Sequence, residues 1–230
     1  MKEFHSLEDW KANGITNLKE LDKTESVEIL KSFKLPTIEA KKFAVGDFCE
    51  EETQSFLEKY APIIIICKPL ARDLPKDGRM YVQNMNQILS CINNLHSDKY
   101  NIFLIEMIEP IKESYVGAAI TDSFGNLTAE FLKKEFLTDI RKLVSGSPNP
   151  KSLSHLNVQN REIINFPKDI PKEDVNYLKR VLIRKEGYFE FIKGTKKGEE
   201  GIYFTDYQNS GSFMGPTYCS KGGETKYEEY

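Results

Sequence analysis

Residues 62–69 have the sequence Pro-Ile-Ile-Ile-Ile-Cys-Lys-Pro, and this stretch is the strongest indication of the fold in the sequence. Four consecutive β-branched residues favour a strand, and the run is too short for a helix. Because no polar residue alternates with the isoleucines, we expect both faces of the strand to be buried. The stretch therefore predicts a central strand of a sheet, which ends at Lys68-Pro69.

Hydrophobic periodicity predicts further elements on both sides of this strand. Apolar residues at i, i+3, i+4 and i+7 share one face of a helix, and the residue before a proline is disfavoured in helical space. The predicted elements are a helix that Thr24 caps and that ends at Leu35-Pro36, an exposed strand over 38–45, a helix over 50–60, a loop over 70–79 and a core-facing helix over 84–95.

The second half of the chain is rich in short segments with strand character. Turn residues separate these segments, which is the pattern of hairpins and meanders. The predicted elements are a buried strand over 101–108, an antiparallel meander of 115–121 and 127–132, a helix that starts at Pro171, and a hairpin that joins 188–192 to 202–207 through an exposed tip over 193–201.

The composition excludes several classes of protein. The chain has 230 residues, with 32 Lys and Arg against 35 Asp and Glu, and its net charge of −3 supplies no positive field for nucleic acid or anionic lipid. No apolar run reaches the roughly 18 residues that span a bilayer, and the charged N-terminus contains no secretory signal. We expect a cytoplasmic, soluble protein that binds neither membranes nor nucleic acid.

The four cysteines are widely spaced, with no C-x-x-C pair. This spacing argues against a zinc ribbon, a thioredoxin-type motif and a disulfide framework. Cys67 and Cys91 belong to predicted buried elements, so we expect both to be reduced core residues.

The order helix, Leu35-Pro36, strand, helix and buried strand ending in Lys68-Pro69 resembles the opening of an ATP-grasp domain. In that family these elements build the first nucleotide-binding lobe, and a helix and a strand with an acidic hinge follow, here 84–95 and 102–109. The resemblance covers roughly residues 24–132. It implies an α+β, ATP-grasp-like fold of two lobes, with antiparallel sheets and flanking helices.

The resemblance also implies a division of the chain. Residues 1–23 are expected to be an N-terminal extension, 24–208 the ATP-grasp-like domain with its hinge near 100–110, and 209–230 a flexible C-terminal tail. Two prolines among small residues mark 145–152 as a candidate linker between lobes.

Candidate nucleotide-binding residues follow from the same comparison. The Lys68 ammonium, held at the end of a buried strand, is a point charge suited to phosphate oxygens, and the Arg79 guanidinium can bind two such oxygens at once. Glu106 marks the hinge, and a carboxylate such as Glu106 or Glu109 can accept hydrogen bonds from ribose hydroxyls. The alternative is structural: Lys68 can be the exposed residue that ends a strand, and Arg79 a solvated loop charge.

A metal site is implied on the late hairpin, where Glu190 and Asp206 lie on neighbouring strands. Mg²⁺ prefers one or two carboxylates together with phosphate oxygens and water. If Glu190 pairs with Phe204, Asp206 lies diagonally on the same face, about 7 Å away. A one-residue slip would move these side chains to opposite faces, so the register stays open. The alternative is a hairpin with acids that only face solvent.

The implied function is ATP binding, with carboxylate activation and ligation or phosphoryl transfer assisted by Mg²⁺, so the enzyme classes are ATP-dependent ligase and phosphotransferase. The acceptor, a small molecule or a protein, is not indicated. Two departures from the family pattern favour an alternative, a non-catalytic scaffold or interaction module: the loop over 70–79 has one glycine, and Ile192 stands where a Glu-x-Asn pattern starting at Glu190 needs Asn. A third departure, the few residues before the first helix, leaves the acceptor substrate unassigned.

Overall fold

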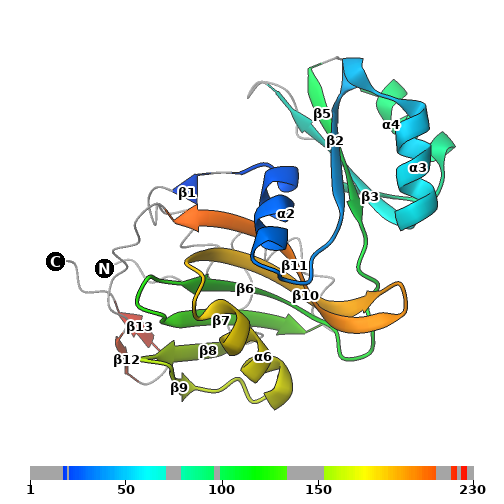
Figure 1. Cartoon of the computed structure of the whole chain (residues 1–230). Helices are drawn as coiled ribbons and strands as arrows, with labels where there is room; N and C mark the ends of the chain where they lie inside the picture. The colour runs from blue at the N-terminus through cyan, green and yellow to red at the C-terminus, as the bar shows by residue number, and fades with distance from the viewer. Residues whose placement is uncertain are drawn as a thin grey trace.

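The computed structural model describes residues 18–19, 21–70, 79–95, 99–133, 153–210, 219–221 and 224–226. Two antiparallel sheets, each with its own helices, form a small and a large lobe (Figure 1). Strands β12 (Cys219–Lys221) and β13 (Glu224–Lys226) pair separately. The predicted α+β class with antiparallel sheets in two lobes is confirmed.

The small lobe contains a four-stranded sheet in the order β2-β5-β3-β4, which α3 and α4 cover on one face (Figure 1). Ile63, Ile65 and Cys67 face these helices, because alternate side chains of a strand point to the same side. The predicted central strand is confirmed. The elements are β2 (Ala40–Ala44), the 3₁₀ turn η1 (Val45–Asp47), α3 (Glu50–Tyr60), β3 (Ile63–Pro69), β4 (Arg79–Val82), α4 (Met85–Asn93) and β5 (Tyr100–Glu106).

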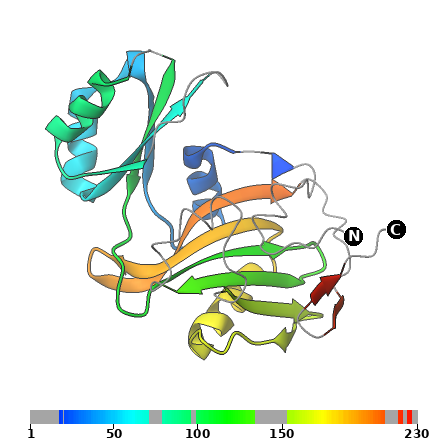
Figure 2. The ribbon, with the colours of Figure 1, turned by 180° about the vertical axis from the view of Figure 1, so that it is seen from behind.

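The large lobe contains a seven-stranded sheet in the order β1-β11-β10-β6-β7-β8-β9. Seen from behind, the sheet lies in front of α6, so this helix covers one face (Figure 2). Val175, Leu178 and Leu182 of α6 are fully buried in the core against that face. The elements are β1 (Leu18–Lys19), β6 (Tyr115–Thr121), β7 (Leu127–Lys133), β8 (Leu153–Gln159), β9 (Glu162–Asn165), α6 (Lys172–Leu182), β10 (Gly187–Lys196) and β11 (Glu199–Ser210).

Helix α2 (Lys23–Ser32) packs against β11 and begins two residues earlier than the sequence pattern predicted. The cap is Asp22 rather than Thr24, because the Asp22 carboxylate accepts hydrogen bonds from the backbone N–H groups of Thr24 and Glu25. The Glu25 carboxylate accepts from the Asp22 N–H in return, which completes a capping box.

The lobes are joined by the segment between β5 and β6, which the tip of the β10–β11 hairpin contacts. Glu109 and Thr195 exchange two backbone hydrogen bonds, of 2.9 and 2.8 Å. The prediction of an exposed tip over 193–201 is wrong for Lys196, whose side chain is 21% exposed and pairs with Glu106. The candidate linker at 145–152 lies outside the described residues.

Two further observations concern the ends of the chain and the membrane prediction. β1 falls within the predicted extension and pairs with Asn209 and Ser210 at the end of β11. Among the described residues, no helix has the length and apolar character needed to cross a bilayer.

Candidate functional site

A cluster of packed apolar side chains joins the two sheets. The small lobe contributes Phe103 and Ile105 from β5, with Ile64 and Ile66 of β3 packed against them, and the large lobe contributes Tyr203 of β11 with Ile192 of β10. We call this set the interlobe cluster; its other members are Val27, Ile38, Ala40 and Ile108. The six core members are at most 8% exposed, whereas Ala40, Ile64, Ile66 and Ile192 are only partly buried and form the accessible edge of the cluster.

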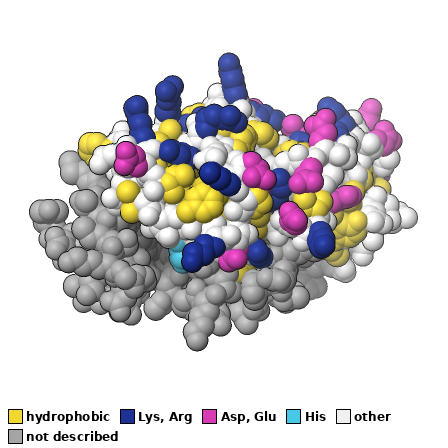
Figure 3. All heavy atoms as spheres, turned by 90° about the horizontal axis from the view of Figure 1, so that it is seen from below, with side chains coloured by type: hydrophobic (Ala, Val, Ile, Leu, Met, Phe, Trp, Pro, Cys, Tyr) yellow, Lys and Arg dark blue, Asp and Glu magenta, His cyan; other side chains and the backbone are white. Residues whose placement is uncertain are grey.

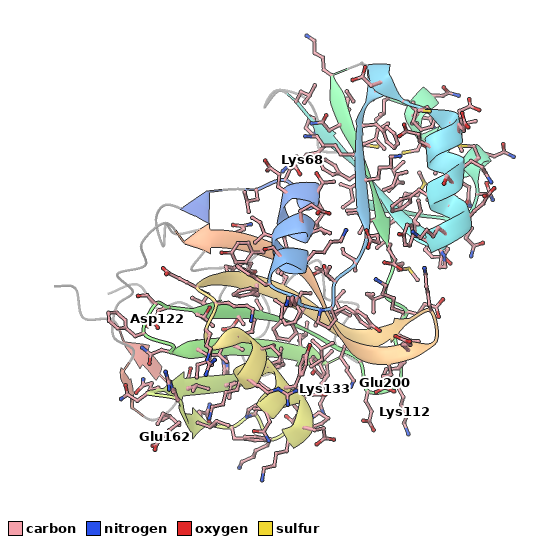
Figure 4. All side chains as sticks on the ribbon, viewed as in Figure 1. Lys68, Lys112, Asp122, Lys133, Glu162 and Glu200 are labelled. Atoms are coloured by element: carbon pink, nitrogen blue, oxygen red, sulfur yellow. The ribbon has the colours of Figure 1, made fainter. Side chains whose placement is uncertain are left out.

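Polar side chains follow the apolar residues of the cluster along β3 in the small lobe and along the β10–β11 pair in the large lobe. On β3, Lys68 follows Ile64 and Ile66 at alternate positions and is exposed. Lys68 lies at the end of β3, on the side of the small lobe above α2 (Figure 4). In the large lobe, the pair Ile192 and Tyr203 is followed by Glu190 and Asp206.

Glu190 and Asp206 are direct partners across the β10–β11 ladder. This differs from the predicted pairing of Glu190 with Phe204, which the structure pairs with Phe191. The reason is a β-bulge after Glu190, which inserts one extra residue into β11 and changes the register. Directly opposed residues have Cβ atoms about 4.5–5.5 Å apart, so the two side chains start closer together than in the predicted diagonal arrangement.

The neighbours of these acids show which face they occupy. Phe189 and Phe191 of β10 are buried in the large-lobe core, together with Phe204 and Tyr207 of β11. Because side chains alternate along a strand, Glu190 lies on the opposite face from Phe189 and Phe191. The acids therefore belong to the sheet face that also carries Ile192 of the interlobe cluster.

Fixed contacts orient both carboxylates. Tyr188 Oη donates to Glu190 Oε1 at 3.2 Å, and the Tyr207 N–H donates to Asp206 Oδ1 at 2.9 Å. Lys23 Nζ of α2 lies 3.0 Å from Asp206 Oδ2. Two oriented carboxylates are hard oxygen donors, which fits Mg²⁺ in chemical type, but the Lys23 ammonium already neutralises one of them.

Gln208 was missed by the sequence reasoning. It pairs with Tyr188, lies two positions after Asp206 and is 5% exposed. Alternation along β11 could have found it, since residues i and i+2 share a face. Its amide oxygen is a hard donor on the strand face that also carries Asp206. Within the described part of the chain, no group of three or more His, Cys, Asp and Glu side chains could hold a metal ion.

Glu106 is buried, and its carboxylate is engaged. Lys196 Nζ lies 2.9 Å from Glu106 Oε2, and the Glu39 N–H donates to the same oxygen at 3.0 Å. Lys196 Nζ also donates to the Thr37 carbonyl at 2.7 Å. These contacts tie the end of β5 to the hairpin tip and to the chain that precedes β2.

Glu109 and Arg79 have different surroundings. Glu109 is exposed and lines a small polar cavity of about 210 Å³ together with Lys59, Tyr60 and Lys197. Arg79 is the first residue of β4 and pairs with Ile66 of β3, while its side chain is outside the described set. The structure thus brings Glu190 and Asp206 together, and attaches Lys68 and Arg79 to the same β3–β4 pair.

A larger groove of about 740 Å³ lies elsewhere, where the start of β6, the end of β7 and the N-terminus of α6 meet. Its charges are mixed: Lys112, Lys133 and Lys168 stand beside Glu113 and Asp169. The molecular face seen from below is also mixed, with Lys and Arg interspersed among acidic and hydrophobic side chains (Figure 3). None of the residues predicted to bind a nucleotide or a metal is among those that line the groove.

No protein-family model matches the chain, and no curated protein matches it. Among solved structures, it is similar to the D-alanine–D-alanine ligase of Bacillus anthracis complexed with ATP, with 16% identity and a TM-score of 0.43 over 82% of this chain and 55% of that chain. For the VanG D-Ala:D-Ser ligase of Enterococcus faecalis the values are 14%, 0.45, 84% and 53%.

A third similar structure is the carboxyaminoimidazole ribonucleotide synthase of Aspergillus clavatus complexed with ATP, with 10% identity and a TM-score of 0.44 over 81% of this chain and 44% of that chain. The chain thus spans about half the length of these structures. Sequence identity to all three structures is 16% or less, and the TM-scores do not exceed 0.45.

Proposed function

We propose that the protein binds ATP between its two lobes. The observation that carries this proposal is that, in both lobes, apolar side chains are followed along the strands by charged ones. The apolar interlobe cluster is followed by Lys68 on the small lobe, and by the directly paired Glu190 and Asp206 on the large lobe. An adenine ring would lie against the partly buried edge of the cluster, formed by Ile64, Ile66 and Ile192, with the phosphates directed toward Lys68.

The remaining candidates receive roles that fit their surroundings. Arg79 would assist Lys68 on the phosphates from the adjacent strand. Glu106 would act as a positioning residue, because its carboxylate is engaged by Lys196 and Glu39 and holds the hinge backbone in place. Glu109 is exposed beside the hinge and would accept hydrogen bonds from ribose hydroxyls.

Glu190 and Asp206 would hold Mg²⁺, with Gln208 as an additional oxygen donor. When bound, the cation would neutralise phosphate charge and orient the phosphate oxygens. The chain's own residues would position the nucleotide and exclude water from the apolar end of the cleft. The reaction class that follows is carboxylate activation with ligation, or phosphoryl transfer, to a small-molecule or protein acceptor.

A second candidate function is a non-catalytic scaffold that keeps this fold. One observation favours it: lysine side chains already form ion pairs with two of the carboxylates to which ATP-dependent catalysis would assign a role. Lys23 is paired with Asp206 and Lys196 with Glu106. A protein that retains these pairs without binding nucleotide would use the fold for contact with another macromolecule.

Calorimetric titration with ATP and with ADP, each with and without Mg²⁺, tests the proposal. The informative variants are Lys68→Ala and Glu190→Gln. Lys112→Ala and Glu162→Gln are matched controls, because both residues are exposed and the labelled side chains lie away from Lys68 (Figure 4). Circular dichroism and thermal melting first establish that each variant is folded.

We expect micromolar binding that Lys68→Ala weakens about tenfold or more, the effect of removing one charge-assisted contact of about 1.5–3 kcal/mol. Glu190→Gln should weaken the Mg²⁺ dependence and leave metal-free binding nearly unchanged. The two controls should bind as the wild type does. Absence of binding at millimolar nucleotide would reject the proposal in favour of the scaffold.

A further inference from the structure

Two thiols are in contact between α4 and the strand that carries Lys68. Cys67 Sγ of β3 is 3.6 Å from Cys91 Sγ of α4. Both belong to the small-lobe core, where the face of α4 that contains Ile88 packs on the sheet. Formation of a disulfide requires the two sulfur atoms to approach to about 2.05 Å, so the remaining movement is about 1.5 Å. Rotation of the Cys91 side chain together with a small shift of α4 can supply it.

The two cysteines differ in their access to solvent, and the difference suits a two-step oxidation. Cys67 is 2% exposed, whereas Cys91 is only partly buried. A small oxidant therefore reaches Cys91 first, because susceptibility to oxidation follows exposure. The buried Cys67 is already in contact with it and is placed to act as the resolving thiol. Cys49 packs against the same core and is also partly buried, so it is the control cysteine for oxidation of Cys91.

We propose that Cys67 and Cys91 form a reversible intramolecular disulfide when the protein meets a peroxide. In the first step the Cys91 thiol is oxidised by hydrogen peroxide to sulfenic acid, and one water is released. The Cys67 sulfur then attacks the sulfenyl sulfur; the S–S bond forms, the S–O bond breaks, and the hydroxide leaves with the Cys67 proton as a second water. Two thiols and one peroxide thus yield one disulfide and two waters. A dithiol reductant reverses the modification.

The bond would fix the end of β3 from which Lys68 projects. Cys67 directly precedes Lys68, and both pair with β5, opposite Ile102 and Asn101. The disulfide would add a covalent link from this strand end to α4 and would close a loop of about 25 residues between them. Oxidation should therefore stiffen β3 and α4 whether or not a nucleotide is bound.

Mass spectrometry of the full chain tests the inference directly. The reduced protein is treated with hydrogen peroxide, remaining thiols are alkylated, and peptides are mapped without reductant. We expect a cross-linked species that joins the Cys67 and Cys91 peptides, 2 Da lighter than their sum, and its loss on reduction. Cys49→Ser should form the same species, and Cys91→Ser should not. Full alkylation of Cys67 and Cys91 under conditions that oxidise Cys49, or a bond that includes Cys49, would overturn the inference.

A second measurement tests whether the disulfide stiffens the protein. It uses only the wild type, so it does not require any variant to fold. The oxidised wild type should melt roughly 5–10 °C higher than the reduced protein, as expected for a cross-link that closes a loop of this length. Amide exchange should slow in the peptides that contain β3 and α4, and reductant should reverse both changes. Unchanged melting and exchange in a sample shown by mass to be cross-linked would contradict the stiffening.

Discussion

Lys196 and Glu106 form an ion pair that joins the tip of the β10–β11 hairpin to the end of β5, with 2.9 Å between Lys196 Nζ and Glu106 Oε2. The Glu106 side chain is 3% exposed and that of Lys196 21%. The pair lies where the chain leaves the small lobe, so it fixes the large-lobe hairpin against the end of the small-lobe sheet. It also explains why a hairpin tip rich in lysine is not simply a solvated turn.

Replacing Lys196 with methionine should destabilise the protein strongly. The variant keeps the length of the side chain, but among the described residues it leaves the Glu39 N–H as the hydrogen-bond donor to the buried Glu106 carboxylate. Breaking one side of a buried pair costs about 3–5 kcal/mol. Urea unfolding should show this loss, and adding Glu106→Gln to Lys196→Met should recover part of it. The exposed neighbour Lys197→Met serves as control and should cost less than about 1 kcal/mol.

Position 194, where the β10–β11 hairpin approaches the hinge segment, requires glycine. A Cβ atom added at Gly194 would lie 2.6 Å from the Glu109 carbonyl oxygen and 2.6 Å from Ile108 Cγ2. Gly194→Ala should therefore push the hairpin away from the hinge and destabilise the fold by about 1–3 kcal/mol, the usual cost of overpacking. Thermal melting measures the effect. Gly46→Ala is the matched control, because nothing lies within 4 Å of its added Cβ; equal melting of the two variants would contradict the prediction.

The local elements could be predicted from the sequence where a single pattern decides them. The bounds of α3 and β6 match the predicted 50–60 and 115–121, since helical spacing or strand-forming residues in each run end at clear turn signals. The cap of α2 was misplaced because Asp22 and Thr24 are both good capping residues, and the reciprocal bond from Glu25 selects Asp22.

The candidate site was harder to predict because it depends on register and on distant contacts. The bulge after Glu190 is a backbone irregularity that strand periodicity does not reveal, and it decides that Asp206 rather than Phe204 faces Glu190. The partners of Glu106 and Asp206 are lysines from remote segments, which only the folded chain brings near. The buried position of Gln208, by contrast, follows from the alternation that starts at Asp206.

Acid should remove the stabilising contribution of the Asp22 charge. Partial burial raises the pKa of Asp22, but the hydrogen bonds from Lys42, Thr24 and the Glu25 backbone outweigh it and lower the pKa from 3.8 to about 2. Because the folded-state pKa lies below the unfolded value, the contribution is present above pH 3.8 and is lost as the pH falls toward 2.

The comparison of wild type with Asp22→Asn measures this effect, because asparagine keeps a capping oxygen but carries no charge. The stability difference, about 0.5–1 kcal/mol for a lost partly exposed ion pair and helix-dipole interaction, should be constant near neutral pH. Urea unfolding at a series of pH values should show the two curves converge between pH 4 and 2. A difference that persists at pH 2, or one equally present in the exposed control Glu162→Gln, would contradict the assignment.

Lys23 should compete with a divalent cation for Asp206. Lys23 Nζ lies 3.0 Å from Asp206 Oδ2, so a cation that binds this carboxylate must displace or share the ammonium. Lys23→Met removes the competing charge while keeping the apolar stem, and it should tighten Mg²⁺ binding about fivefold, since a partly exposed ion pair contributes about 1 kcal/mol. Calorimetric titration of Mg²⁺ into protein saturated with ADP measures the change. Lys31→Met is the control, because Lys31 lies on the same helix but pairs with Glu28 and Glu39. An unchanged or weaker affinity in Lys23→Met would show that Asp206 does not hold the cation.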